Sequence, residues 1–216
     1  MRIVVTAGPT REALDPVRFI SNRSSGKMGY ALAAAAQELG EDVTLISGPV
    51  ALTPAAGVKL IQITSADELY DAVHTHAADC DLLVMCAAVS DYKPARVAKE
   101  KLPKRTSAFA LELVPTRDIL LSLPRIRSYI VAGFAAETHE LAANARAKLA
   151  RKNCDAIVAN DVSRADSGME SDHNEVTIFT PDGDAKQIAR AEKKIIAREI
   201  LKILRALTEK SLTKKT

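Results

Sequence analysis

The chain has 216 residues, of which 47% are hydrophobic and 26% charged, and its formal net charge is +3. A chain of this length can bury the core of one large α/β domain, and the composition is ordinary for a globular protein. The small net charge gives no general reason to expect binding to nucleic acid or to a membrane surface. No apolar run approaches the roughly 20 residues that a membrane-spanning helix needs.

The N-terminal residues and the cysteines both favour a cytoplasmic protein. The apolar run at residues 2–5 is too short for a signal peptide and is soon followed by Gly8-Pro9. The three cysteines, Cys80, Cys86 and Cys154, are odd in number and lack the spacing of a metal site. We therefore interpret them as buried free thiols in a reducing compartment.

Strand and helix signals alternate through the first part of the chain. The sequence predicts strands at 2–6, 43–46, 59–63 and 81–86 and helices at 27–39 and 66–79. Gly40 stands where a left-handed residue commonly ends a helix. Ser65 and Glu68 have the spacing of a capping box, which marks the start of the second helix.

The alternation breaks at residues 87–107, a long basic loop, before a predicted strand at 109–113. Loops of this length inside a compact domain are usually functional. The later predicted elements are strands at 130–133 and 156–159, a helix at 138–152, a hairpin containing 175–179 and 181–183, a helix at 189–209 and a frayed polar tail at 210–216.

This order predicts one domain at 1–209 with a Rossmann-like, doubly wound, mostly parallel sheet, a long basic flap and a small antiparallel addition. Ligands of such sheets bind beyond the carboxyl ends of the strands. The loops expected to face one crevice there are Gly8–Gly29, Ala87–Lys104, Phe134–Glu137 and Asn160–Asp161.

The turn Gly26-x-x-Gly29 opens the first predicted helix, where free backbone N–H groups and the helix dipole attract an anion. A dinucleotide site needs G-x-G-x-x-G directly after the first strand and an acidic residue after the second, but residues 46–48 are Ile-Ser-Gly. A P-loop needs glycine at position 21 and a hydroxyl at position 28, which hold Ser21 and Met28. Neither motif is complete.

A third hypothesis uses the long loop itself. Asn22, Ser24 and Ser25 would surround one anion with an amide and two hydroxyls. Positive charge would come from the basic loop (Lys93, Arg96, Lys99, Lys101, Lys104 and Arg105) and from Lys148 and Lys152, which share a helix face. A nucleoside triphosphate with Mg²⁺ requires about this much positive charge. An ordinary solvated surface is the alternative for the same lysines.

Six motifs occur in an order that points to one family. They are Thr6–Glu12, Asp15–Gly29, Ala87–Tyr92, Gly133–Thr138, Asn160–Ser163 and Ser171–Asn174. With them the chain resembles phosphopantothenoylcysteine synthetase, also called phosphopantothenate–cysteine ligase, over about residues 2–207. In many bacteria this enzyme is the C-terminal half of a bifunctional coenzyme A biosynthesis protein.

The resemblance implies a ligase that joins 4′-phosphopantothenate to L-cysteine. It implies CTP as co-substrate with Mg²⁺, an acyl-cytidylate intermediate, and release of CMP and pyrophosphate. It also implies a homodimer, to which we expect the segment Phe109–Leu113 to contribute, and fusion to or partnership with a phosphopantothenoylcysteine decarboxylase. The residues themselves do not separate CTP from ATP or name metal ligands, and a non-catalytic or redox nucleotide-binding module is the rival class.

The same resemblance implies roles for particular residues. Asn22 would contact the pantothenate part and support conversion of the intermediate, and Lys101 would act from a mobile flap. The implied substrate-binding residues are Asn22, Ser24, Gly26, Ala87, Ala88 and Asp91. The implied nucleotide-binding residues are Gly8, Ser24, Gly26, Gly29, Asp91, Lys101, Phe134, Lys148, Lys152 and Asn160, with Lys148 and Lys152 at the phosphate end.

The chain departs from the family pattern in two places. Residues 101–104 read Lys-Leu-Pro-Lys, so Pro103 replaces a flap lysine and removes a charge and a backbone donor. Residues 114–118 read Val-Pro-Thr-Arg-Asp, where lysine and a later proline are more common. The contacts of the flap and of the segment 114–118 are therefore open questions for the structure.

Overall fold

The computed structural model describes residues 1–104, 106–137, 139–161 and 170–213. Arg105 of the basic loop, Thr138 at the start of a predicted helix and the motif residues Val162 and Ser163 lie outside the described residues. So do residues 214–216 of the predicted tail.

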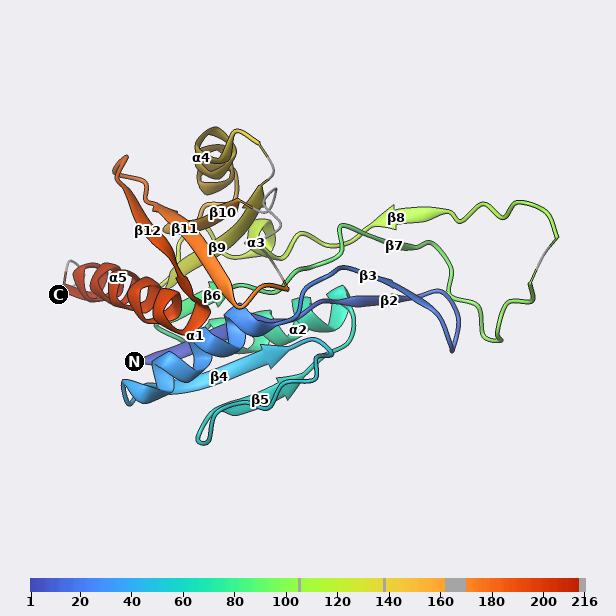
Figure 1. Ribbon diagram of the computed structural model, residues 1–216, viewed down its shortest axis with the longest axis horizontal. Helices are drawn as coiled ribbons and strands as arrows, with labels where there is room; N and C mark the ends of the chain where they lie inside the picture. Colours follow the sequence, from blue (N-terminus) through green and yellow to red (C-terminus); the bar gives the residue numbers. More distant parts are fainter. Residues whose placement is uncertain (105, 138, 162–169, 214–216) are drawn as a thin grey trace.

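One eight-stranded sheet forms the centre of the molecule (Figure 1). Its strands, in spatial order, are β12 (Ala185–Glu192), β11 (His173–Phe179), β10 (Ala156–Asp161), β9 (Ile130–Glu137), β6 (Leu82–Met85), β1 (Arg2–Ala7), β4 (Asp42–Ser47) and β5 (Lys59–Gln62). The strands from β10 to β5 pair in parallel, whereas β11 and β12 add an antiparallel hairpin. The predicted fold class is confirmed.

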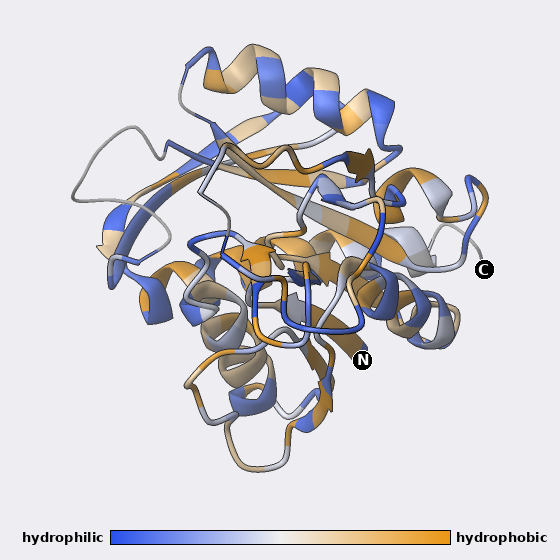
Figure 2. Ribbon diagram, turned by 90° about the vertical axis from the view of Figure 1, so that its right-hand side faces the viewer, coloured by the Kyte–Doolittle hydropathy of each residue, from blue (hydrophilic) through white to orange (hydrophobic). Residues whose placement is uncertain are grey.

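Helices cover both faces of the sheet, which explains why β1 and β6 are continuous apolar runs. On one face α1 (Lys27–Glu38) and α5 (Lys193–Thr213) pack against alternate residues such as Ile3 and Val5. On the other face α2 (Ala66–Ala77), α3 (Ile119–Ser122) and α4 (Leu141–Arg151) pack with Val4. In Figure 2 the hydrophobic colour follows the strands between these layers. No helix of the described segments is both long and apolar enough to cross a membrane.

Several observed element boundaries differ from the predicted ones, mainly because of strand pairing. The predicted loops 134–137 and 160–161 are the last residues of β9 and β10, because the pairing continues through Asn160 with Ala136 and Asp161 with Glu137. The predicted helix at 189–209 begins only at Lys193, because β12 stays paired with β11 up to Glu192. At its other end α5 runs to Thr213, so residues 210–213 are helical and not a frayed tail.

The predicted strand at 109–113 is wrong in position. The observed strand is β8 (Leu113–Pro115), which pairs antiparallel with β7 (Tyr92–Pro94), inside the predicted basic loop. Pro94 faces Leu113 in this ladder, and beyond it the N–H of Ala95 still donates to the carbonyl oxygen of Glu112 at 3.0 Å. A second hairpin joins β2 (Arg11–Ala13) to β3 (Phe19–Ser21), and together the two hairpins form an arm that projects from the sheet (Figure 1).

The turn that connects β2 to β3 is organised by the buried carboxylate of Asp15. It accepts hydrogen bonds from the backbone N–H groups of Val17 (2.9 Å), Arg18 (2.8 Å) and Leu102 (3.1 Å), and from the guanidinium of Arg18. Burial alone would raise the pKa of Asp15, but these donors hold it well below its usual value. The carboxylate therefore ties the segment around Lys101 to the β2–β3 hairpin.

Candidate functional site

A cavity of about 790 Å³ opens at the carboxyl ends of the parallel strands, where the crevice was predicted. All four predicted loops contribute to it, and α4 adds a further wall. Of the predicted site residues, it brings together Asn22, Ser24, Gly26, Gly29, Ala87, Ala88, Asp91, Phe134, Lys148, Lys152 and Asn160. Gly8 and Lys101 are not among the described residues that line it.

The first turn of α1 forms one wall of the cavity. Gly26 caps the helix in a left-handed conformation (φ 77°), and no side chain caps the free N–H groups that follow. Lys27, Met28 and Gly29 of that turn all line the cavity. The predicted glycine turn and helix start are therefore confirmed, whereas the binding of an anion there stays a prediction.

Gly8 lies beneath this turn and not in the cavity wall. Its φ is 76°, and a Cβ there would sit 3.1 Å from the Gly48 carbonyl oxygen and 3.0 Å from a methyl group of Val50. A Cβ on Gly26 would meet the same Val50 methyl at 2.9 Å and the Gly8 α-carbon at 3.5 Å. Gly8 therefore lets the loops approach each other closely, and its predicted contact with a nucleotide stays a prediction.

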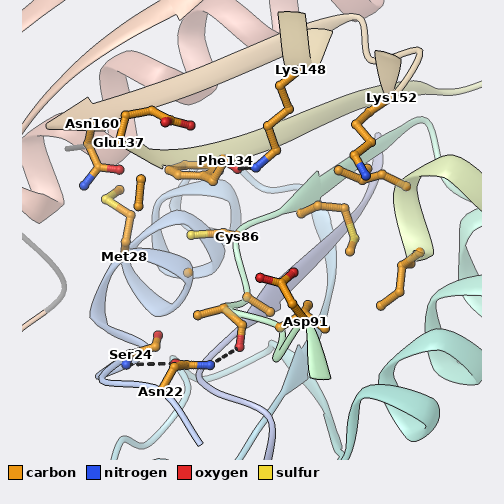
Figure 3. Close-up of a pocket in the computed structure, with 18 of the residues that line it drawn as sticks. Asn22, Ser24, Met28, Cys86, Asp91, Phe134, Glu137, Lys148, Lys152 and Asn160 are labelled. Carbon is orange, nitrogen blue, oxygen red and sulfur yellow. Dashed lines mark hydrogen bonds between the residues drawn. The ribbon is translucent and has the colours of Figure 1, made fainter. Parts of the chain in front are cut away.

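The side-chain amide of Asn22 joins two loops of the site (Figure 3). Its Nδ2 donates to the carbonyl oxygen of Ala88 at 2.6 Å, and its Oδ1 accepts from the N–H of Ser24 at 3.0 Å. The Oγ of Ser24 in turn accepts from the N–H of Gly26 at 3.4 Å. Asn22 therefore sets the position of the turn before α1 relative to the loop after β6.

Lys148 of α4 and Lys152, which caps the C-terminus of that helix, reach the cavity from the opposite wall (Figure 3). The Nζ of Lys148 donates to the carbonyl oxygen of Phe134 at 2.8 Å, and burial lowers the pKa of this lysine. Lys152 forms an ion pair with Asp118, whose other oxygen caps α3. Both lysines thus line the cavity and also bind a protein group. The side chain of Phe134 adds an apolar surface to the cavity.

Lys101 is exposed on the arm, next to Leu102, which Asp15 anchors. The arm extends away from the sheet (Figure 1), and Lys101 is not among the described residues that line the cavity. Any contact of Lys101 with a cavity ligand would require the segment around it to close.

Cys86 lies on the cavity wall and is half-buried, whereas Cys80 and Cys154 are buried. All three are free thiols, as predicted. Burial raises the pKa of Cys86 to about 12. The thiol is therefore protonated near neutral pH and is a poor nucleophile.

Several cavity residues were missed in the sequence. Six cations and amides that line the cavity had no predicted role, namely Lys27, Arg117, Asn144, Arg151, Asn174 and Lys193. Asn174 is the last residue of the motif Ser171–Asn174, but no role was predicted for it. Lys193 was hidden within the predicted helix at 189–209, and only the register of β12 reveals that it is the first residue of α5.

The family described as "DNA/pantothenate metabolism flavoprotein C-terminal domain" matches residues 1–207. The coenzyme A biosynthesis bifunctional protein CoaBC of Vibrio vulnificus is 46% identical over 210 residues, 95% of this chain and 52% of that protein. Its namesake in Bacillus subtilis is 45% identical over 211 residues, 97% of this chain and 52% of that protein. The chain thus spans about half the length of these relatives. A crystal structure of the C-terminal domain of a CoaBC protein is 41% identical and superposes with a TM-score of 0.82, covering 97% of this chain and 96% of that one.

Proposed function

The chain belongs to the DNA/pantothenate metabolism flavoprotein C-terminal domain family, and from that premise we propose that it is a ligase of coenzyme A biosynthesis that joins 4′-phosphopantothenate to L-cysteine at the expense of CTP. The observation that carries the proposal is the convergence, in one cavity, of the α1 N-terminus, the Asn22 turn, Lys148 of α4 and its C-cap Lys152. An anion-binding helix start and several cations suit a reaction between a phosphorylated acid and a nucleoside triphosphate.

The proposed chemistry has two steps. A carboxylate oxygen of 4′-phosphopantothenate forms a bond to the α-phosphorus of CTP, and the bond from that phosphorus to the bridging oxygen breaks, so that its electron pair leaves with pyrophosphate. The cysteine amine then bonds to the acyl carbon of the cytidylate, CMP leaves with the electron pair of the cleaved C–O bond, and the nitrogen loses a proton. The acyl-cytidylate is sensitive to water, so closure over the cavity would protect it.

The chain's own groups fit these steps. Asn22 and the loop from Ala87 to Asp91 would hold the acid, and the first turn of α1 would direct its N–H groups at a phosphate. Phe134, Lys148 and Lys152 would hold the nucleotide on the opposite wall. Because Asn22 fixes both loops that meet at the acid, we assign it the alignment of acid and nucleotide.

Mg²⁺ would enter with the nucleotide. No group of three His, Cys, Asp or Glu side chains able to hold a metal occurs among the described residues. Mg²⁺ bound mainly by phosphates needs only one or two carboxylates, and Asp91 and Glu137 line the cavity. Either carboxylate could serve as such a ligand, and the ion would neutralise phosphate charge.

We further propose that the chain works as a homodimer through its arm. The arm exposes large apolar side chains, namely Val17, Phe19, Tyr92, Val97, Phe109 and Leu113. Grouped on one projection, such side chains are typical of an interface. A sedimentation mass of one chain at micromolar concentration would contradict the dimer. By analogy with the bifunctional relatives, a phosphopantothenoylcysteine decarboxylase is the expected fusion or functional partner.

Substitution of the flap lysine tests the closure that the mechanism requires. Lys101→Gln is expected to lower kcat by roughly tenfold to a hundredfold with little change in the KM for CTP, because the charge acts only in the closed state. Lys59→Gln, which removes an exposed charge at the start of β5, is the control and should change kcat less than threefold, roughly the scatter of a surface substitution. Equal kinetics for Lys101→Gln and the wild type would remove this lysine from the mechanism.

Pyrophosphate release is the experiment that tests the proposed function. Release should require 4′-phosphopantothenate, CTP and Mg²⁺, and phosphopantothenoylcysteine should form only when cysteine is added. Replacing CTP by ATP in the same assay determines the nucleotide preference. Stabilisation against heat by NADPH, with no effect of CTP or ATP and no pyrophosphate, would instead favour the redox nucleotide-binding class.

A further inference from the structure

The outer face of α2 carries four residues that contact parts of the chain far away in sequence. They are Asp67, Tyr70, Asp71 and His74, and their spacing of three and four residues places them on one side of the helix. The other side, with Leu69 and Val73, packs in the core. We call the four residues the α2 stripe. Their partners lie in the arm and around α3, so the stripe joins α2 to segments that lead into the cavity wall.

A single carboxylate of the stripe binds both strands at the root of the arm, which we define as residues 90–94 and 114–118. Lys93 lies in β7, and its Nζ forms an ion pair with Oδ2 of Asp67. Arg117 follows the end of β8 by two residues, and its Nε donates to Oδ1 of Asp67 at 3.2 Å. The hydrogen bond from Lys93 lowers the pKa of Asp67, so this carboxylate is charged near neutral pH.

The guanidinium of Arg117 is held by three residues of the stripe. Besides its bond to Asp67, its Nη2 donates to a carboxylate oxygen of Asp71 at 3.1 Å. Its central carbon lies 3.7 Å from the centre of the Tyr70 ring, which is a cation–π contact. Arg117 belongs to the segment 114–118, where the chain departs from the family pattern, and it also lines the cavity. One planar cation thus connects the outer face of α2 with the cavity wall.

The residue after Arg117 begins the part of the wall that meets Lys152. Asp118 caps α3 by accepting from the N–H of Leu121 at 3.0 Å, and it forms the ion pair with Lys152. α3 has only four residues, too few for a helix to be stable by itself. Its last residue, Ser122, is joined to the stripe by a 2.9 Å hydrogen bond between its Oγ and Nε2 of His74. The stripe therefore holds this part of the wall at both ends.

The root of the arm is also bonded within itself, next to the loop after β6. Thr116 donates from its N–H to the carbonyl oxygen of Asp91 at 2.9 Å, and from its Oγ1 to that of Ser90 at 2.7 Å. Asp91 ends the loop to which we assign the acid, and Asp118 with Lys152 lies on the wall to which we assign the nucleotide. A shift of the root would therefore change how these two parts of the cavity face each other.

The ion pairs of the stripe are weak one by one, because the side chains of Asp67 and Arg117 are 39% and 47% exposed. Three such pairs that share these two side chains form a network, which is the case in which exposed pairs matter. On the basis of the proposed function, we propose that Asp67 and Arg117 are positioning residues for the ligase reaction. Through them α2 holds the root of the arm, so that the acid and the nucleotide meet in the alignment that activation requires.

Asp67→Asn removes the shared charge and tests this assignment in the ligase assay. A looser root lowers the fraction of molecules whose cavity walls are aligned, and this fraction enters the rate with either substrate. We therefore expect kcat/KM to fall by the same factor for CTP and for 4′-phosphopantothenate, roughly fivefold to thirtyfold, as two or three exposed pairs acting together can supply. Asp67→Glu keeps the charge and should recover part of the loss. Asp79→Asn, which removes an exposed carboxylate just beyond α2, is the control and should stay within about twofold of the wild type.

A double-mutant cycle shows whether Arg117 acts through Asp67. Arg117→Gln should lower kcat/KM about as much as Asp67→Asn does, and the double variant should lose little more than either single variant. Hydrogen exchange of the protein without ligands adds a readout that needs no turnover. In Asp67→Asn the amides of residues 90–94 and 113–118 should exchange faster than in the wild type, whereas those of β1 and β6 should not change.

Wild-type kinetics in Asp67→Asn would overturn the assignment, and so would losses that multiply in the double variant. A large loss in Arg117→Gln beside near-normal Asp67→Asn would also overturn it, because Arg117 would then act on a substrate directly. Faster exchange throughout the protein would mean that Asp67 only stabilises the fold. Failure of the proposed function gives a different pattern: the wild type would form no product, while faster exchange confined to the root in Asp67→Asn would still show that α2 holds the arm.

Discussion

Asn22→Asp is expected to reduce turnover by at least roughly a hundredfold, the size of effect seen when a group that positions reactants is lost. The wild-type Nδ2 lies 2.6 Å from the carbonyl oxygen of Ala88. A carboxylate oxygen at that place would repel the carbonyl and would also repel the acid substrate. The bond from the N–H of Ser24 can still form, so the helix start should keep its shape and nucleotide affinity should change less than threefold. Single-turnover kinetics and calorimetry with CTP measure the two quantities.

Asn22→Ala separates the lost hydrogen bond from the added charge. If the alignment of the two loops is what matters, alanine should lose most of the activity as well. If only the negative charge is harmful, alanine should be nearly as active as the wild type. Normal turnover in Asn22→Asp would show that this residue has no part in the reaction.

Gly48→Ala is expected to destabilise the fold by about 3 kcal/mol or more, at the upper end of overpacking effects. A Cβ at position 48 would lie 1.8 Å from the backbone oxygen of Pro9, and a backbone atom cannot move aside as a flexible side chain can. Pro9 bridges to Ala88, the acceptor of Asn22, so the strain would also reach the site. For a chain of this size the loss corresponds to a fall in Tm of roughly 6–12 °C.

Gly40→Ala is the matched control for this change. Gly40 has a φ of 77°, but no described atom lies within 4 Å of the Cβ that alanine would add. Gly40→Ala should therefore lower the free energy of unfolding only by the strain of a left-handed alanine, about 1–2 kcal/mol. A Gly48→Ala variant that melts at or above the temperature of Gly40→Ala would contradict the close approach of the loops after β1 and β4.

The central architecture was predictable because its signals are local. The buried runs of β1 and β6, the cap formed by Ser65 and the turn at Gly26 are each encoded within a few residues. The rule that ligands bind at the carboxyl ends of parallel strands then placed most of the candidate residues in one cavity. That cavity follows from topology and needs no knowledge of side-chain contacts.

What the sequence missed depends on contacts between distant segments. The start of α5, and with it the place of Lys193, is set by the pairing of β12 with β11. The position of β8 is set by β7, about twenty residues earlier in the chain. The packing of Gly8 against Gly48 and Val50 joins segments about forty residues apart, and no local pattern in the motif reveals it.

The reaction is tested most directly by following an oxygen-18 label placed in the carboxylate of 4′-phosphopantothenate. Activation at the α-phosphorus transfers one carboxylate oxygen to the nucleotide, so we expect the label in CMP and none in pyrophosphate after one turnover with cysteine. Mass spectrometry of CMP and of pyrophosphate shows which product carries the label. Label in inorganic phosphate, accompanied by CDP, would mean attack at the γ-phosphorus and would contradict the proposed acyl-cytidylate.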